Sequence, residues 1–499
     1  MNRRTFFKNS AALFSAPYIR SCSRKNKPNL LFLWTDEQRR DTLAAYGNQW
    51  IQTPHLDQLA RESVVLEHTY VSQPVCTPSR ATAMTGLWPH QHSCTANNLP
   101  LPESVACLPE RLHDSEYRTG YMGKWHLGDE ICAQHGFEEW ISIEDGYRKH
   151  YSAHRDRALR SSYWNYLHGL EYEPDAADGY YSRDFASKLP MEHGKPAFLT
   201  THAIDFLRRH RRDPFILCVN FLEPHMPFYG PLNDLYDPHS IPLPENFYDP
   251  LEENEPLRYR LLREQYRQQG FGGHDLKSEE GWRTLMARYY GLVSLVDRSV
   301  GAILTELERL QLADHTVVVF TSDHGDMMGS HQLLAKTVMY EESIAVPWLM
   351  RVPSWGRRLH RASGRFSHID LAPTLLELLG RRTALPGKSL LPILRSGRPA
   401  QDPVFIQWNG SEGRTPVGHL GVSDQEATRV HNAPIRTVIT QEGWKLCLAQ
   451  NDKHQLFNLR QDPHETANLY TAAGHKKEIT GLRRMIETWQ KNEKDTVQV

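Results

Sequence analysis

Three short apolar runs stand out in the pattern of hydrophobic and polar positions, at residues 30–34, 215–221 and 316–320. Each is rich in aliphatic side chains and ends abruptly in polar residues. Short apolar runs of this kind, without polar alternation, are typical of parallel strands that are buried on both faces. The pattern therefore predicts an α/β fold built on a mostly parallel sheet.

Polar residues follow the predicted ends of all three strands. They are Asp36 after the first, Glu223 and His225 after the second, and Asp323 and His324 after the third. In open α/β sheets ligands bind at the carboxyl edge of the strands. We therefore expect these dispersed side chains to be neighbours in space.

Two segments show the periodicity of helices with one buried face. The first starts with Thr53 as N-cap and Pro54 at the first helical position, and positions 56, 59, 60 and 63 form its inward face. The second carries apolar residues at positions 289, 292, 293, 296, 300, 303, 304 and 307. Both stripes indicate packing and carry no functional signal.

The rest of the chain divides into insertions and a smaller carboxyl-terminal part. Residues 140–195 and 230–280 are rich in aromatic and charged side chains without regular periodicity, which indicates long insertions of the kind that select substrates. After residue 392 two paired strands, at 444–448 and 454–459, and a helix at 476–490 predict an α+β subdomain. We expect a catalytic domain at 28–395 and this subdomain at 396–499.

Charge and cysteine content exclude some classes of function. With 58 basic and 59 acidic side chains the net charge is close to zero, so nucleic acid is not an expected partner. The basic run 208–212 is predicted to be a solvated helix end. The seven cysteines show no zinc-finger spacing. Pairing of Cys94 with Cys107, or of either with Cys132, stays open, but we expect no disulfide framework.

The first 27 residues predict an export signal. Residues 2–8 resemble a twin-arginine motif, and the apolar stretch that follows, 11–18, is too short to span a bilayer. The signal indicates export to the periplasm, with no transmembrane span. Lipid anchoring at Cys22 is not expected, because Arg20 places a charge next to it.

The segment Cys76-Thr77-Pro78-Ser79-Arg80 carries the strongest chemical signal. A short helix is expected to run from Pro78 to Thr85 and to end at Gly86, with Cys76 at its amino end. Free N–H groups and the helix dipole at this end favour an oxyanion and lower a thiol pKa. The alternative interpretation is a buried, inert cysteine beside a turn.

This segment resembles the Cys-x-Pro-Ser-Arg signature of type I sulfatases, whose cysteine is oxidised to formylglycine. Further matches span roughly residues 28 to 470: they are the segments 29–39, 123–128, 224–227, 321–326 and 367–374, together with Lys336. The resemblance implies the alkaline phosphatase superfamily fold, a large mixed, mostly parallel sheet flanked by helices. It also implies hydrolysis of sulfate esters and a formylglycine-generating or sulfatase-maturating enzyme as partner.

The resemblance further implies a divalent metal, usually Ca²⁺, with Mg²⁺ or another ion as alternatives. The matching positions are Asp36, Glu37, Asp323 and His324, together with the modified Cys76. Glu37 stands where Asp is common in the family, and His324 stands where Asn is frequent. Because Ca²⁺ prefers oxygen ligands, His324 could instead contact sulfate or lie behind the metal ligands.

Catalytic roles follow from the same resemblance. Arg80 would hold the modified residue, and Lys124 and Lys336 would bind the sulfate oxygens. His126, on the same side as Lys124 if the segment is extended, would help to release enzyme-bound sulfate, and His225 would protonate the leaving alcohol. Weaker candidates for the rim of the pocket are Gln38, Arg39 and His331.

Two other functions stay open at this point. One is hydrolysis of phosphonate or phosphate esters by an enzyme of the same superfamily. The other is binding of sulfated glycans without catalysis, if Cys76 is never converted. The exported protein and its aromatic insertions favour a sulfated oligosaccharide or polysaccharide as substrate.

Overall fold

A computed structural model describes residues 27–410 and 420–499, and it shows a large α/β domain joined to a small antiparallel sheet. The main sheet has nine strands in the order β4-β3-β5-β1-β6-β8-β2-β7, with β9 paired to β2. The pairs β1 with β5, β1 with β6 and β3 with β5 are parallel, whereas β8 is antiparallel to both β6 and β2. The predicted mixed, mostly parallel sheet is confirmed. Residues 1–26, which contain the twin-arginine motif and Cys22, lie outside the described residues.

The strands of the main sheet are β1 (Asn29–Asp36), β2 (Val64–Tyr70), β3 (Arg118–Gly123), β4 (Glu139–Ile141), β5 (Phe215–Pro224), β6 (Thr316–Ser322), β7 (Ala345–Val346), β8 (Trp348–Arg351) and β9 (His360–Ser367). The small sheet consists of β10 (Val404–Trp408), β11 (Ile435–Ile439), β12 (Trp444–Ala449) and β13 (Gln455–Asn458). All three apolar runs are therefore strands, and they lie next to one another at the centre of the sheet.

The α-helices are α1 (Pro54–Arg61), α2 (Cys76–Thr85), α3 (Pro89–His92), α4 (Leu108–Leu112), α5 (Ser162–Gly169), α6 (Arg183–Ser187), α7 (Lys195–Arg209), α8 (Leu257–Gln269), α9 (Glu279–Arg309), α10 (Glu341–Ile344), α11 (Leu371–Leu378), α12 (Leu391–Ser396), α13 (Asp424–His431) and α14 (Lys476–Glu493). The helix α9 extends ten residues beyond the amino end of the predicted stripe. The helix α8 lies in an insertion where no helix was predicted.

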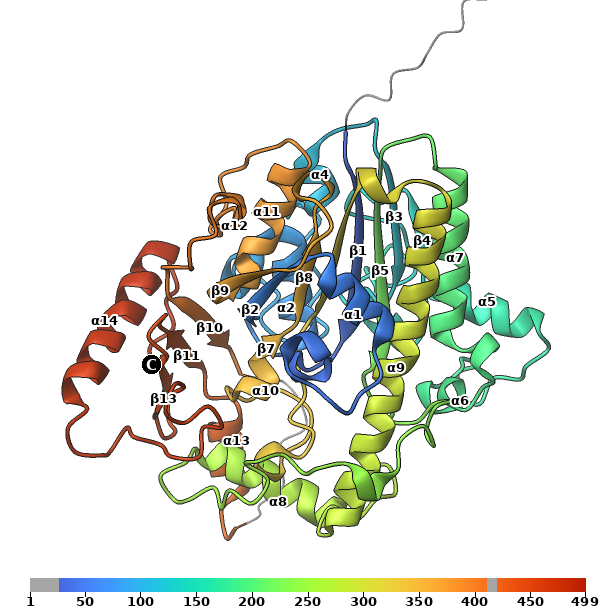
Figure 1. Cartoon of the computed structure of the whole chain (residues 1–499). Helices are drawn as coiled ribbons and strands as arrows, with labels where there is room; N and C mark the ends of the chain where they lie inside the picture. The colour runs from blue at the N-terminus through green and yellow to red at the C-terminus, as the bar shows by residue number, and fades with distance from the viewer. Residues whose placement is uncertain (1–26, 411–419) are drawn as a thin grey trace, which may run out of the picture.

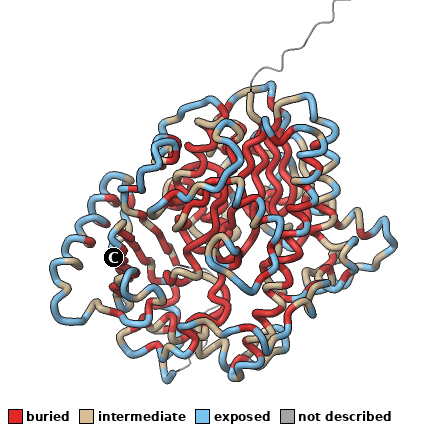
Figure 2. The backbone as a smooth tube through the Cα atoms, in the orientation of Figure 1, coloured by how far each residue is buried: buried red, intermediate tan, exposed pale blue. Residues whose placement is uncertain are grey.

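The central strand β1 is buried along its whole length, within the red centre of Figure 2. Its side chains alternate between two apolar cores. Phe32 and Trp34 point to a core shared with α2, α4 and α11. Leu31 and Leu33 point to a core shared with α1, α7 and α9. The sheet is therefore sandwiched between two layers of helices, as seen on either side of β1 and β5 in Figure 1. This explains why the strand sequences are apolar throughout.

The amino end of α1 is held by a distant helix rather than by its own N-cap. Thr53 is the N-cap residue, as predicted, but its hydroxyl donates to Asp57 and accepts no backbone N–H. The carboxylate of Asp297, in α9, accepts from the N–H groups of Leu56 at 2.7 Å and His55 at 3.3 Å. Tertiary packing, and not the side chain of Thr53, therefore supplies the acceptor for the first N–H groups of α1.

The carboxyl-terminal part packs β10 to β13 and α14 against the main domain, at the left of Figure 1. The predicted pair of strands, β12 and β13, is antiparallel. Lys445 in β12 is fully buried and pairs with Glu465 at 2.7 Å and with Glu341, the first residue of α10, at 3.3 Å. The N–H of Gln407 donates to the carbonyl of Ser72 at 2.8 Å. These contacts connect the small sheet to the loop at Ser72 and to the amino end of α10 in the main domain.

The structure also bears on membrane-spanning helices and on disulfide bonds. In the described ranges, none of the helices combines the length and the apolar character that a bilayer span requires. The six cysteines in the same ranges are unpaired.

Candidate active site

The carboxyl edge of the three central strands gathers the predicted polar residues. Asp36 is the last residue of β1, Asp323 follows β6 directly, and His225 follows β5. The register places Asp36 next to Pro224 across one pair of strands and Thr35 next to Ser322 across the other. The predicted neighbourhood is therefore confirmed, and it follows from parallel pairing of β1 with β5 and β6.

Cys76 is the first residue of α2. It is buried beneath this edge and only 2 % exposed. The helix begins there and not at Pro78 as predicted, because the N–H of Ser79 already bonds the carbonyl of Val75 at 3.2 Å. Pro78 is tolerated at the third helical position, since an N–H there has no partner within the helix. The side-chain oxygen of Asn97 accepts the N–H of Thr77 at 3.0 Å. Gly86 ends the helix in a left-handed conformation, as predicted.

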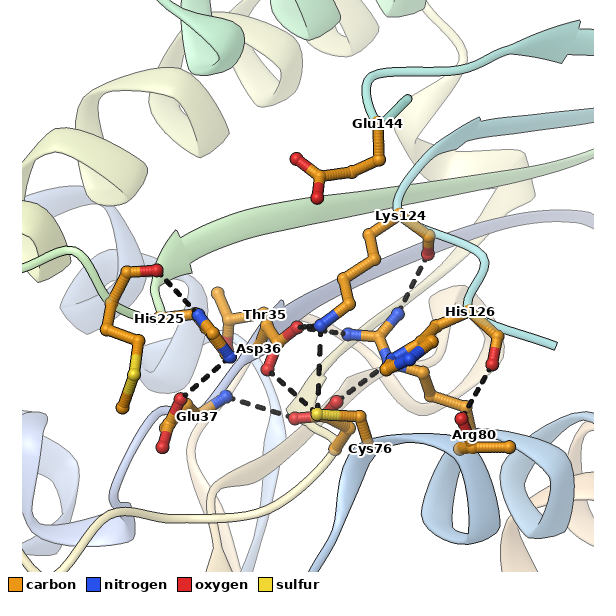
Figure 3. Close-up of polar contacts among 12 residues, drawn as sticks. Thr35, Asp36, Glu37, Cys76, Arg80, Lys124, His126, Glu144 and His225 are labelled. Carbon is orange, nitrogen blue, oxygen red and sulfur yellow. Dashed lines mark hydrogen bonds and ion pairs between the residues drawn. The ribbon is translucent and has the colours of Figure 1, made fainter. Parts of the chain in front are cut away.

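The thiol of Cys76 faces a polar cluster (Figure 3). Its Sγ atom lies 3.2 Å from Nε2 of His324, 3.7 Å from Nζ of Lys124 and 3.8 Å from Oδ1 of Asp36. Burial and Asp36 raise the pKa of the thiol, whereas Lys124, Lys336 and His324 lower it. The lowering effects are larger, so the pKa lies below its ordinary value. The alternative interpretation, a buried and inert cysteine, does not fit these polar surroundings.

Two carboxylates and two cations form the floor of the site, and all four side chains are fully buried. The guanidinium of Arg80 lies 2.8 Å from Asp323 and 3.0 Å from Asp36, and it donates to the carbonyl of Lys124 at 2.8 Å. The ammonium of Lys124 pairs with Asp36. Buried charges of this density require mutual compensation, so these residues depend on one another for their positions.

The same edge offers a set of donor atoms that fits a metal ion. Ligand atoms of Asp36, Cys76, Asp323 and His324 lie within 4.8 Å of one another, and all four residues are buried. His324 donates from Nδ1 to the carbonyl of Gly325 at 2.9 Å, so Nε2 is the ring nitrogen that faces the cluster. The residues therefore fit a divalent cation with mixed oxygen and nitrogen ligands.

Glu37 belongs to an adjacent group and not to this four-donor set. Its Oε2 atom accepts from Nζ of Lys336 at 2.8 Å and lies 3.3 Å from Nε2 of His225. Nζ of Lys336 is also 3.2 Å from that nitrogen. The other oxygen of Glu37 is buried without a partner among the described residues, and burial raises the pKa of this carboxyl to about 8. Glu37, Lys336 and His225 thus form one hydrogen-bonded group beside Asp36.

His126 also reaches the site, but by a different backbone path from the one predicted. Its φ of 59° is left-handed, so the segment is not extended as expected. Glu130 holds the turn by accepting the N–H groups of Trp125 and His126 at 2.8 and 2.7 Å. Nε2 of His126 lies 2.9 Å from the side-chain oxygen of Asn98, and the ring stacks on Tyr147 at 4.2 Å.

Further side chains, some predicted and some not, lie around the site. The weaker rim candidates have other partners: Gln38 donates to Thr42, Arg39 pairs with Asp41, and His331 bonds Asp249 at 2.5 Å. Sequence reasoning missed side chains that surround the site from the loop after α3 and from the first insertion. These are Asn98, Glu144, Tyr147, Arg183 and Lys195. The position of Tyr147 and Arg183 in an insertion with aromatic and charged content was the available signal.

Comparison with known proteins agrees with this geometry. Residues 28–381 match the family model described as Sulfatase. The chain belongs to the sulfatase family. Residues 329–492 of this sulfatase match a second model, N-sulphoglucosamine sulphohydrolase, C-terminal, which includes Lys336 and the small sheet. As a member of the family the chain is a sulfuric ester hydrolase.

Relatives of this sulfatase cover most of its length. The uncharacterized sulfatase YidJ of Escherichia coli (strain K12) is 28 % identical over 465 residues, which cover 89 % of this chain and 83 % of YidJ. An N-acetylglucosamine-6-O-sulfatase of Bacteroides thetaiotaomicron is 25 % identical, covering 96 % of this chain and 89 % of that protein. The structure of the phosphonate monoester hydrolase from Silicibacter pomeroyi has a TM-score of 0.77 at 22 % identity and covers 94 % of this chain and 96 % of the other. That structure shares the fold.

Proposed function

We propose that this sulfatase hydrolyses sulfate esters of a carbohydrate with the residue at position 76 as nucleophile, after oxidation of Cys76 to formylglycine. The observation that carries the proposal is the position of Cys76 at the amino end of α2, within 3.8 Å of His324, Lys124 and Asp36. The sulfur atom stands where the hydroxyl of the hydrated aldehyde would be. Relatives that act on sulfated sugars, such as the N-acetylglucosamine-6-O-sulfatase, support a carbohydrate substrate.

Asp36, Asp323 and His324 would hold the divalent cation together with the residue at position 76, and Glu37 would support them from its adjacent group. Calcium is the ion expected from the sequence, and a nitrogen ligand at His324 also suits other divalent ions. Such an ion would supply Lewis-acid stabilisation of the negative charge on the nucleophile and on sulfate.

The cationic side chains would bind and orient the sulfate group. Lys124 presents its ammonium group beside Asp36, Lys336 presents its own beside the adjacent Glu37, and Arg80 lies between Asp36 and Asp323. Fixed cations in a site shielded from water stabilise charge that develops during the reaction. These three residues therefore account for recognition of a tetrahedral oxyanion.

The two histidines would move protons. Nδ1 of His225 lies 2.7 Å from the carbonyl of Met226, and Nε2 faces Nζ of Lys336 at 3.2 Å. The Lys336–His225 pair thus holds a proton that can pass to the leaving alcohol. His126, held by Asn98 and Tyr147, would accept a proton during release of sulfate from the enzyme.

Maturation and export complete the proposal. Oxidation of Cys76 requires a formylglycine-generating or sulfatase-maturating enzyme as partner. The twin-arginine motif at residues 2–8 favours export to the periplasm in folded form. Cell fractionation of the full chain and of an Arg3→Lys, Arg4→Lys variant tests this point, because loss of export in the variant alone is expected.

The decisive test combines mass spectrometry with a substrate comparison. The tryptic peptide that contains Cys76 should carry the aldehyde, and the converted enzyme should turn over aryl and sugar sulfates. A plain thiol together with tight binding of sulfated sugars would identify a non-catalytic binding protein. Faster turnover of an aryl phosphonate or phosphate diester than of the aryl sulfate would identify an ester hydrolase of the other class.

A further inference from the structure

Arg183, the first residue of α6, extends from the first insertion to the edge of the active site. Its Nε donates to Glu144 at 2.7 Å, and its Nη2 donates to the hydroxyl of Tyr147 at 2.7 Å. Tyr147 in turn stacks on His126. The side chain of Arg183 remains 27 % exposed. The insertion therefore delivers a cation to the entrance of the site.

Glu144 fixes this guanidinium in place. The carboxylate is 5 % exposed, and its second oxygen is paired with Lys195, which is equally buried. Burial raises the pKa of Glu144, but Arg183 and Lys195 lower it to about 2, so the group is charged. A buried carboxylate with a second cation partner can position Arg183 without neutralising it fully. The guanidinium is thus oriented before any substrate binds.

The third nitrogen of Arg183 lacks a suitable acceptor. Nη1 lies 3.3 Å from Nδ1 of His225, but Nδ1 is also 2.7 Å from the carbonyl oxygen of Met226. A carbonyl oxygen only accepts, so the shorter contact makes Nδ1 a donor. Within residues 27–410 and 420–499 no other hydrogen-bond partner is found for Nη1. This N–H group is available to a ligand.

The position of Arg183 relative to the sulfate-binding residues sets the geometry of that ligand. Arg183 and Lys336 contact opposite nitrogens of the His225 ring. The distance between the cationic groups of Arg183 and Lys336 is therefore set by the width of an imidazole ring and two contacts of 3.3 and 3.2 Å. This span suits two substituents on one sugar ring. Tyr229, 37 % exposed, lines the same small cavity as Arg183 and His225.

We propose that Arg183 binds a second anionic group, a carboxylate or a second sulfate, on the sugar whose sulfate ester is cleaved. The inference rests on the proposed function and names its substrate class, a dianionic sugar. The free Nη1 of a guanidinium held in this way can donate a charge-assisted hydrogen bond to a carboxylate or sulfate oxygen. Arg183 is accordingly a specificity residue, and the cleavage itself is left to the residues around Cys76.

The test compares three sugars with the converted, full-length enzyme. One is a neutral hexose with a single sulfate, one carries a second sulfate, and one is the corresponding sulfated uronic acid. The measured quantity is the ratio of kcat/KM for each dianionic sugar to that for the neutral one. In Arg183→Gln this ratio should fall about 10- to 100-fold, the effect of one lost hydrogen bond between charged groups. Arg183→Lys, which keeps the charge, should lie between Gln and wild type.

The control is Arg148→Gln, in the same insertion, because Arg148 pairs with the exposed Asp178. Its ratio should equal that of wild type. The sugar with the larger fall identifies sulfate or carboxylate as the bound group. Equal losses on all three sugars in Arg183→Gln, or a wild-type ratio near one, would overturn the proposal.

Failure of the proposed function is recognised separately. Calorimetric binding of the same sugars to the unconverted chain, which retains Cys76, measures the preference without catalysis. If no sulfate ester is cleaved but the dianionic sugar still binds at least tenfold more tightly and Arg183→Gln removes this preference, the role of Arg183 stands and catalysis alone is refuted. If the unconverted chain shows no preference, the role of Arg183 is refuted.

Discussion

Replacement of Arg80 by methionine should destabilise the protein and make its stability more dependent on divalent cations. The guanidinium makes two fully buried ion pairs, at 2.8 Å with Asp323 and 3.0 Å with Asp36. Removing one member of a buried ion pair costs about 3–5 kcal/mol, because it leaves an uncompensated charge. In Arg80→Met, Lys124 beside Asp36 and His324, whose Nε2 lies 3.6 Å from Asp323, remain against the two carboxylates. We expect a loss of about 3–5 kcal/mol in the free energy of unfolding when divalent cations are chelated.

The assay is urea unfolding of wild type and variant, with chelator and with excess Ca²⁺. A cation that binds the folded state stabilises it by mass action. The variant site has one positive charge fewer, so it repels Ca²⁺ less. The stabilisation by Ca²⁺ should therefore be larger in Arg80→Met than in wild type.

Arg436→Met is the matched control for this experiment. Arg436 is also fully buried and pairs with Asp495, with Nη2 and Oδ1 2.9 Å apart, in the carboxyl-terminal part. It should lose comparable stability but gain no more from Ca²⁺ than wild type does. A loss below about 1 kcal/mol in Arg80→Met with chelator, or the same Ca²⁺ effect in both variants, would refute the reasoning.

Three further predictions concern catalysis. Exhaustive chelation, or Asp323→Asn, should abolish most sulfatase activity, since the cation stabilises the negative charge of the reaction; full activity after metal removal, verified by elemental analysis, would contradict this. His225→Ala should lower kcat/KM for alkyl sulfates about 10²- to 10⁴-fold and that for nitrophenyl sulfate far less, because a good leaving group needs no proton; equal losses would exclude the acid role. Cys76→Ser should release at most about one equivalent of alcohol and then stop with sulfate on the serine, because a single hydroxyl cannot expel the group again; intact-protein mass shows the adduct, and sustained turnover would argue against a formylglycine mechanism.

The central strands and the residues that follow them could be predicted from the sequence because one physical pattern determines both. The strands that precede Asp36, Asp323 and His225 are buried on both faces, so their sequences are continuously apolar, and the first polar residue marks the edge of the sheet. Parallel pairing then brings these edges together. Cys76 was found from the turn chemistry around Pro78 and Gly86, although the helix starts two residues earlier than expected.

The remaining parts of the site depend on contacts that leave no periodic signal. The left-handed backbone at His126 is fixed by Glu130, and the amino end of α1 is capped by Asp297 from a helix more than 200 residues away. Tyr147 and Arg183 reach the site from an insertion without regular spacing. Such side chains are positioned by tertiary packing, and local sequence cannot predict where they point.

The contacts of the small sheet have a consequence for shortened forms of the protein. Gln407 holds Ser72, four residues before Cys76, and Glu465 accepts the N–H of Glu341, five residues after Lys336, at 2.7 Å. A premature stop codon near position 400 would thus release both active-site loops while leaving every strand of the main sheet intact. The shortened product would keep the main sheet but lose the contacts that fix the segments next to Cys76 and Lys336, so activity depends on the last hundred residues although none of the residues proposed for catalysis lies among them.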